Sequence, residues 1–121
     1  MALRCLIVDD STGFLDAARV LLEREGIDVV GIASTAAEAV QRAAALRPDV
    51  TLVDIDLGGE SGFDLTRRLA RAGEGSRVIL VSTHSQEDFA DLIATSPALG
   101  FLPKSALSAR AILTLLGNGG P

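Results

Sequence analysis

Short apolar runs alternate with amphipathic stretches five times along the chain. The apolar runs are typical of buried strands, which we predict at residues 3–8, 29–33, 50–53, 78–81 and 100–102. Between them, apolar residues recur at helical spacing and predict helices at residues 14–25, 35–47, 63–72, 85–96 and 106–116. This alternation is the pattern of an α/β protein.

Turn and cap signals mark the ends of the predicted helices. Gly26 stands just past the first helix, where a glycine commonly ends one. Thr35 and Glu38 fit a capping box at the start of the second helix, and Pro48 ends it. We expect the first helix to bury one apolar face, made of Phe14, Ala18, Leu21 and Leu22.

Strands that alternate with helices imply right-handed β-α-β units and a parallel sheet. Strands this continuously apolar need helices on both faces, which predicts a doubly wound, flavodoxin-like sheet with five strands and five helices. The expected strand order is 2-1-3-4-5. Ligands bind such sheets beyond the carboxyl ends of the strands, where the winding reverses between strands 1 and 3.

Polar residues gather at these carboxyl ends. Each alone has an ordinary explanation, such as a helix cap or a solvated surface charge. Together they form a set that converges on one edge of the sheet: Asp9 and Asp10 after strand 1, Asp54 and Asp56 after strand 3, Ser82 and Thr83 after strand 4, and Lys104 after strand 5.

The acidic part of this set needs a counter-charge. Strands 1 and 3 are neighbours in the predicted order, so Asp9, Asp10 and Asp54 crowd together. Two like unit charges about 4 Å apart repel by roughly 4 kcal/mol at an effective dielectric of 20. Oxygen ligands without His or Cys favour a hard ion such as Mg²⁺, while Lys104 and Ser82 suit phosphoryl oxygens. The set therefore predicts a carboxylate nucleophile, a metal ion and two phosphate-holding groups.

Composition narrows the alternatives. The 121 residues fit one domain, and the net charge of −5 argues against nucleic acid or an anionic membrane as the main partner. A single cysteine, Cys5, excludes an internal disulfide, and a single histidine, His84, leaves no zinc or haem cluster. Without an apolar run of roughly 20 residues or a signal peptide, we expect a soluble cytoplasmic protein.

At this point the chain resembles the receiver domain of bacterial two-component response regulators. The resemblance covers residues 1–121, with no effector domain, and includes the loop 57–62, which is similar to the family's Leu-Pro-x-x-x-Gly segment. It implies that Asp54 takes a phosphoryl group from the phosphohistidine of a sensor histidine kinase. It also implies Mg²⁺, with Mn²⁺ as an alternative, held by Asp10, Asp54 and the backbone carbonyl of Asp56, with Asp9 acting directly or through water.

The same resemblance assigns the remaining residues. Lys104 would pair with one phosphoryl oxygen, and Ser82 would hydrogen-bond another. Phe101 matches the aromatic switch residue that moves inward behind that hydroxyl, although a plain core role also fits it. The output surface would be helix 4, strand 5 and helix 5, facing a downstream protein or effector domain. Asp56 and His84 occupy positions that tune dephosphorylation. Such a domain assists its own phosphorylation and dephosphorylation but is not an enzyme.

Three positions depart from the family pattern. Gly58 replaces the usual proline and should loosen its loop. Thr83 stands where a small residue is common, and Ser105 stands where proline is frequent, so we expect no cis peptide bond after Lys104. None of these departures removes a chemical group from the site.

Two other function classes are consistent with parts of the sequence. A haloacid-dehalogenase-type phosphatase shares the Asp-x-Asp motif of Asp54 and Asp56, but it places that motif on its first strand and expects Thr or Val at the position of Gly58. A receiver-like interaction module that is never phosphorylated usually lacks an acid or the lysine, and this chain keeps them all.

The output route is suggested only by resemblance. Residues 82–89 and 100–112 look most like receivers attached to LuxR-type helix-turn-helix regulators. The chain carries no basic recognition helix, so we expect no direct nucleic-acid binding and no membrane contact. The last helix is rich in leucine and alanine. If Leu113 or Leu116 is exposed, it indicates a partner face or a homodimer formed on phosphorylation.

Overall fold

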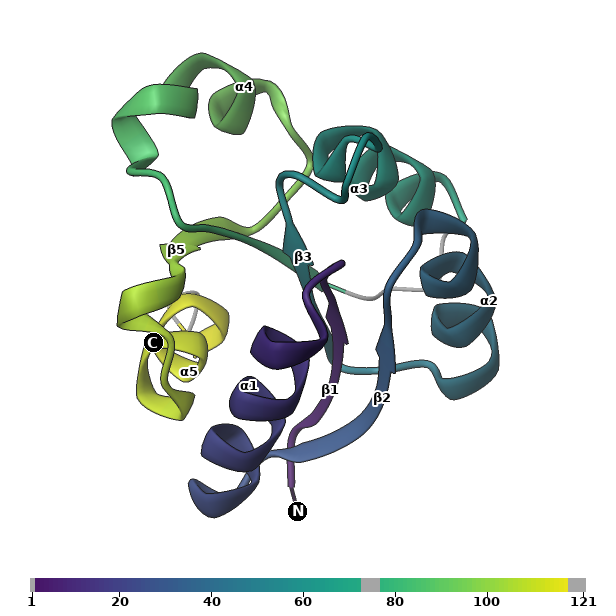
Figure 1. Ribbon diagram of the computed structural model, residues 1–121, viewed down its shortest axis with the longest axis vertical. Coiled ribbons are helices and arrows are strands. Elements are labelled where there is room, and N and C mark those ends of the chain that lie inside the picture. Colours follow the sequence, from purple (N-terminus) through teal and green to yellow (C-terminus); the bar gives the residue numbers. More distant parts are fainter. Residues whose placement is uncertain (1, 73–76, 118–121) are drawn as a thin grey trace.

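The computed structural model describes residues 2–72 and 77–117, and it contains one parallel sheet (Figure 1). The strand order is β2-β1-β3-β4-β5, which confirms the predicted order 2-1-3-4-5. The strands are β1 Arg4–Val8, β2 Asp28–Ala33, β3 Val50–Asp54, β4 Arg77–Ser82 and β5 Gly100–Pro103. Every pairing between neighbouring strands is parallel.

Helices cover both faces of the sheet, as a doubly wound fold requires. Helices α1 (Thr12–Arg24) and α5 (Ala109–Gly117) lie on one face, while α2 (Ala36–Leu46), α3 (Gly62–Arg71) and α4 (Ala90–Thr95) lie on the other (Figure 1). Short 3-10 turns precede two of them, η1 at Gln86–Phe89 and η2 at Lys104–Ala106. None of the helices in the described residues is long and apolar enough to cross a bilayer.

Two predicted helices are shorter than expected. The predicted helix 85–96 is a 3-10 turn followed by a six-residue α-helix, because the Ser85 side chain makes no capping hydrogen bond and neither does Phe89 before α4. The predicted helix 106–116 begins only at residue 109, after η2. Residues 118–121 of the predicted tail lie outside the described residues.

The local signals at the first two helices act largely as predicted. Ser11 caps α1, since its Oγ accepts the Phe14 N–H at 3.2 Å. Thr35 Oγ1 accepts the Glu38 N–H at 3.1 Å. The Glu38 carboxylate accepts from the N–H and the hydroxyl of Ser34. Those bonds from Ser34 hold the pKa of Glu38 below its usual value.

One residue on the predicted buried face of α1 is misplaced. Leu21 is exposed, and Leu15 takes its place in the core beside Ala18 and Leu22. Leu15 lies three residues before Ala18 and seven before Leu22, so the buried stripe is narrower than the predicted one.

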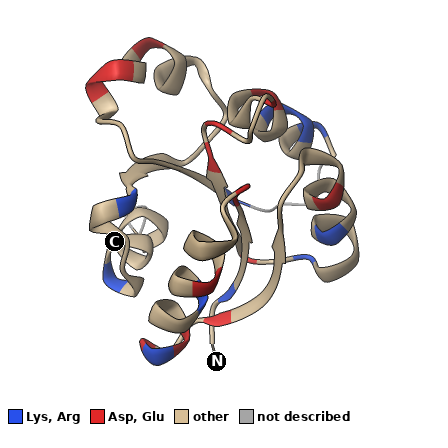
Figure 2. Ribbon diagram, in the orientation of Figure 1, with Lys and Arg blue, Asp and Glu red and all other residues tan. Residues whose placement is uncertain are grey.

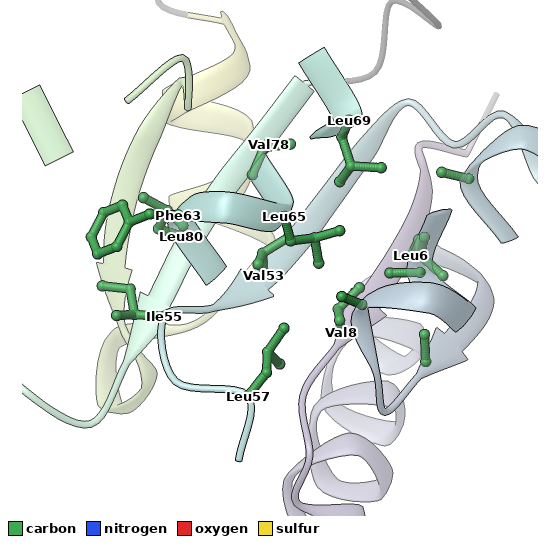
Figure 3. Close-up of a cluster of buried hydrophobic side chains, with 14 of the residues drawn as sticks. Leu6, Val8, Val53, Ile55, Leu57, Phe63, Leu65, Leu69, Val78 and Leu80 are labelled. Carbon is green, nitrogen blue, oxygen red and sulfur yellow. The ribbon is translucent and has the colours of Figure 1, made fainter. Parts of the chain in front are cut away.

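The strands send alternate side chains into two apolar clusters, one on each face of the sheet. Figure 3 shows the cluster beneath α2 and α3, where strand residues such as Val8, Val53 and Leu80 meet Leu65 and Leu69 of α3. Burying one such side chain fully contributes about 1.5–3 kcal/mol. Both clusters extend along the strands, so the core fixes the strand ends relative to one another.

The segment formed by η1 and α4, residues 86–95, is attached differently. None of its residues is buried, and only Phe89 and Ile93 pack against the cluster below. Its charged residues are all acidic, as Figure 2 shows by red without blue on this segment: Glu87, Asp88 and Asp91. We refer to residues 86–95 as the η1–α4 segment.

Candidate functional site

Three acidic side chains meet where β1 and β3 end. Val8 lies opposite Val53 in the paired strands, so the residues that follow, Asp9 and Asp54, leave the sheet side by side. One carboxylate oxygen from each of Asp9, Asp10 and Asp54 lies within 4.8 Å of the others. Asp9 is completely buried and Asp54 is 6% exposed, whereas Asp10 faces solvent.

Backbone amides hold two of these carboxylates in place. Asp9 Oδ1 accepts the Ser11 N–H at 2.8 Å, at the start of α1. Asp54 Oδ1 accepts the Asp56 N–H at 3.3 Å. The other oxygen of each carboxylate is turned toward Lys104, so the two acids present a shared polar face.

Lys104 reaches this face from the end of β5. Ser82 pairs with Pro103, and this register brings the following lysine to the carboxyl edge of the sheet. Lys104 Nζ lies 2.5 Å from Asp9 Oδ2 and 3.5 Å from Asp54 Oδ2. The described residues contain no cis peptide bond, as expected for Ser105 after the lysine.

The electrostatics of the site favour an additional cation. Burial, together with the neighbouring Asp9 charge, raises the pKa of Asp54 to about 6, although Lys104 acts in the opposite direction. Asp9 Oδ2 is buried, and despite the nearby ammonium no donor in the described residues meets it with hydrogen-bond geometry. One ammonium among three carboxylates leaves the site short of positive charge. The all-oxygen donor set matches a hard divalent cation.

A tight turn borders the site. Leu57 and Glu60 exchange backbone hydrogen bonds, and Gly58 and Gly59 between them have φ of 64° and 105°. Asp56 and Ser61 form an antiparallel bridge on either side, so hydrogen bonds close this turn. A Cβ on Gly58 would lie 2.7 Å from Asp10 Oδ2.

Gly62 packs against the same strand end. A Cβ on Gly62 would lie 2.1 Å from the Asp54 carbonyl oxygen, too close for any side chain. The Gly62 N–H donates to the Ile55 carbonyl at 2.7 Å. Only glycine therefore lets the start of α3 approach the backbone of the Asp54 strand.

Ser82 is bonded away from the carboxylates. Its buried Oγ accepts the His84 N–H at 3.0 Å and lies 3.4 Å from His84 Nδ1. The His84 ring meets Phe89 edge-on at 5.8 Å, and Phe89 in turn lies 6.2 Å from Phe63. These contacts join the hydroxyl at the end of β4 to the η1–α4 segment.

The remaining predicted residues occupy separate places. Phe101 is buried in the cluster on the α3 face, so it already points inward. The Asp56 side chain is exposed and accepts the Gly58 N–H, and the Asp56 backbone N–H donates to the Asp54 carboxylate. Thr83 is exposed. The structure thus gathers Asp9, Asp10, Asp54 and Lys104 into one cluster and keeps Ser82 with His84.

One residue of the site was missed by the sequence analysis. Phe14 was predicted only as a core residue of the first helix, but Lys104 Nζ lies 4.3 Å from the centroid of its ring. The available signal was its position in the first turn of the helix that directly follows Asp9 and Asp10.

The chain matches known proteins over nearly all its length. The model of the response regulator receiver domain matches residues 5–116. The response regulator GacA of Pseudomonas viridiflava is 32% identical over 108 residues, covering 86% of this chain and 49% of GacA. UvrY of Escherichia coli O6:H1 is 33% identical over 102 residues, covering 84% of this chain and 47% of UvrY. The chain spans about half the length of these curated relatives.

Solved structures agree with this match. The signal receiver domain of NarL from Mycobacterium tuberculosis superposes with a TM-score of 0.85 at 25% identity, covering 99% of this chain and 98% of that one. A two-component response regulator of the LuxR family from Aurantimonas gives 0.85 at 27% identity, with 98% and 85% covered. With its buried acids and lysine at the carboxyl edge of a 2-1-3-4-5 sheet, the chain belongs to the response regulator receiver domain family of two-component systems.

Proposed function

We propose that Asp54 is the phosphoacceptor of this receiver and that a sensor histidine kinase supplies the phosphoryl group. The observation that carries the proposal is the position of Asp54, nearly buried between two further acids and 3.5 Å from the Lys104 ammonium. An interaction module without phosphorylation has no use for this cluster. A haloacid-dehalogenase-type phosphatase is not supported. That class carries its Asp-x-Asp motif on the first strand, whereas the motif of this chain begins at the last residue of β3.

Mg²⁺, or Mn²⁺ in its place, is the metal that suits the site. Asp10, Asp54 and the backbone carbonyl of Asp56 would hold it, with Asp9 acting directly or through water. Asp9 Oδ2, which is buried and accepts no hydrogen bond from the described residues, and the all-oxygen donor set support this assignment. When bound, the ion neutralises charge on the nucleophile and on the incoming phosphoryl oxygens.

Each residue of the site then has its own role in phosphoryl transfer. A carboxylate oxygen of Asp54 attacks phosphorus, the bond from phosphorus to the kinase histidine breaks, and its electron pair returns to the imidazole nitrogen. Lys104 turns its ammonium from the carboxylates to a phosphoryl oxygen. In dephosphorylation, water attacks phosphorus, the bond from phosphorus to the Asp54 oxygen breaks, and inorganic phosphate leaves the regenerated carboxylate. Asp56 and His84 flank the path of that water and set its rate.

The switch follows from the hydrogen bonds of Ser82. A phosphoryl group on Asp54 offers the hydroxyl a charged acceptor, and taking it releases the His84 N–H and ring. The η1–α4 segment is then free to move relative to Phe101 and β5. A downstream protein or effector domain reads the α4-β5-α5 surface. On α5, Leu113 is 51% exposed and lies beside Glu25 at the end of α1, while Leu116 is partly covered.

The proposal extends to the role of the domain, its location in the cell and its partners. Residues 1–121 act as one receiver domain, which is a phosphoacceptor and not an enzyme with a separate substrate. It works in the cytoplasm, where a sensor kinase draws its phosphoryl group from ATP. It contacts neither nucleic acid nor membrane directly, and the exposed Leu113 of α5 supports a homodimer formed on phosphorylation.

Incubation with acetyl phosphate and Mg²⁺ tests the proposal. We expect one phosphoryl group per chain by intact mass, stable in acid and lost in base, and no labelling of Asp54→Asn. Asp16→Asn is the control, since it removes one exposed carboxylate of α1 that has no part in the proposed site. Equal labelling of wild type and Asp54→Asn would refute the assignment.

A further inference from the structure

The Lys104 ammonium has a third neighbour besides the two carboxylates. Nζ lies 4.3 Å from the centroid of the Phe14 ring, within the range of a cation–π contact. Phe14 sits in the first turn of α1, where its N–H is held by the capping Ser11. The Lys104 side chain is only 15% exposed, so little solvent screens the contact.

This neighbour differs from the carboxylates in one chemical respect. Asp9 and Asp54 are oxygen ligands that a hard divalent cation also binds, and a bound cation repels the ammonium from them. A hard divalent cation takes oxygen ligands, so it does not bind the ring in place of the ammonium. The ring is therefore the one observed partner of Lys104 for which a metal does not compete.

We propose that Phe14 is a positioning residue for Lys104. The Phe14 ring keeps the Lys104 ammonium over the site while a metal occupies the carboxylates. Lys104 then stays close to the incoming phosphoryl oxygens and does not turn into solvent. The consequence for phosphorylation rests on the proposed function of Asp54, but the contact itself does not. Fixing a lysine side chain costs rotamer entropy, so an ammonium that the ring already holds is an advantage before transfer.

A plain packing role for Phe14 makes a different prediction. Phe14 is half-buried and packs against the cluster on the α1 face, a role that leucine fills equally well. A ring that binds the ammonium can be replaced by tyrosine but not by leucine. Comparing Phe14→Leu with Phe14→Tyr therefore separates the two roles.

The sequence contains a single lysine, so lysine labelled with ¹³C gives one ε-CH₂ signal, from Lys104. In the full chain we expect that signal to be shifted upfield by the ring, relative to the urea-unfolded chain, without metal and at saturating Mg²⁺. Phe14→Leu should move it to the unfolded position, and Phe14→Tyr should restore it. The rate of labelling by acetyl phosphate should fall roughly three- to tenfold in Phe14→Leu and recover in Phe14→Tyr.

The outcomes distinguish the two proposals. An unshifted lysine signal at saturating Mg²⁺, or the same signal in Phe14→Leu as in wild type, overturns the role of Phe14 whether or not Asp54 is phosphorylated. A shifted signal in a chain that is never labelled supports the ring contact and rejects the function proposed for Asp54. Thermal unfolding of both variants shows whether they are folded, and the signal of the wild type tests the contact without any substitution.

Discussion

Lys104 and Asp9 form the closest ion pair of the site, with Nζ 2.5 Å from a carboxylate that is completely buried. Removing one partner of a buried pair leaves an uncompensated charge, which is costly. A metal bound by the same carboxylates would bring its charge close to the ammonium. A bound metal and Lys104 would thus oppose each other at Asp9.

We predict that Lys104→Met binds Mg²⁺ more tightly than wild type, by roughly tenfold, because a repulsive charge is lost. The variant should also be less stable in chelator and regain most of that stability in Mg²⁺. Calorimetric titration measures the affinity, and thermal unfolding with and without Mg²⁺ measures the recovery. Arg110→Met, which removes an exposed charge on α5, is the control. Equal or weaker Mg²⁺ binding by Lys104→Met would contradict the opposition.

The stability of the chain should depend on pH through Asp54. Its pKa is raised from 3.8 to about 6, so the folded state binds this proton more tightly than the unfolded state. The contribution of Asp54 to stability is therefore fully present below about pH 4 and is lost as the pH rises through about 6.

Asp54→Asn removes that dependence. In chelator at pH 7.5 we expect the variant to exceed the wild type in free energy of unfolding by up to about 3 kcal/mol, and to match it near pH 4. Urea unfolding at several pH values measures the difference. Asp16→Asn, an exposed acid on α1, should show no such trend. Parallel stability curves for Asp54→Asn and wild type would show that burial of this carboxyl costs little.

The turn at Gly58 and Gly59 offers a matched pair of substitutions. Both glycines have positive φ, so alanine at either should cost roughly 1–2 kcal/mol of stability. Only at Gly58 does the new Cβ meet Asp10 Oδ2, at 2.7 Å, while nothing lies within 4 Å of a Cβ at Gly59. We predict weaker Mg²⁺ binding for Gly58→Ala alone. The same loss in Gly59→Ala would indicate that turn strain, and not the Asp10 contact, sets the affinity.

Cys5 should be inert in the folded chain. It is completely buried in β1, and burial raises the pKa of its thiol to about 12, so almost no thiolate exists at pH 8. We predict that a thiol reagent labels the chain only in denaturant, with one group per chain. Rapid labelling without denaturant would mean that β1 opens far more often than a central strand should.

The strand order and the clustered acids were predictable because both follow from local patterns. Apolar runs specify the strands, the parallel topology brings their carboxyl ends together, and Asp9, Asp54 and Lys104 stand at fixed positions after those ends. Other features depend on how elements dock after they form. The Ala109 N–H donates to Glu25 at 2.6 Å and the Ala36 N–H donates to Glu60 at 3.0 Å, which no local spacing indicates.

The contact of Phe14 with Lys104 belongs to this second class, since 90 residues separate the two in sequence. The break between η1 and α4 has a different cause. An amphipathic pattern and Ser85 predicted one helix, but without a side-chain cap the first turn tightened into a 3-10 turn. No buried side chain in this stretch stabilised a longer helix.

The absence of buried residues from the η1–α4 segment lowers the barrier to remodelling it. Shifting this segment exposes only the partial contacts of Phe89 and Ile93, so it can adopt a second arrangement while the sheet and its acids stay folded. A small change in bonding at Ser82 is then enough to redistribute its conformations. The proposed phosphorylation site therefore lies on the well-packed sheet, and the proposed response lies on a segment with few buried contacts.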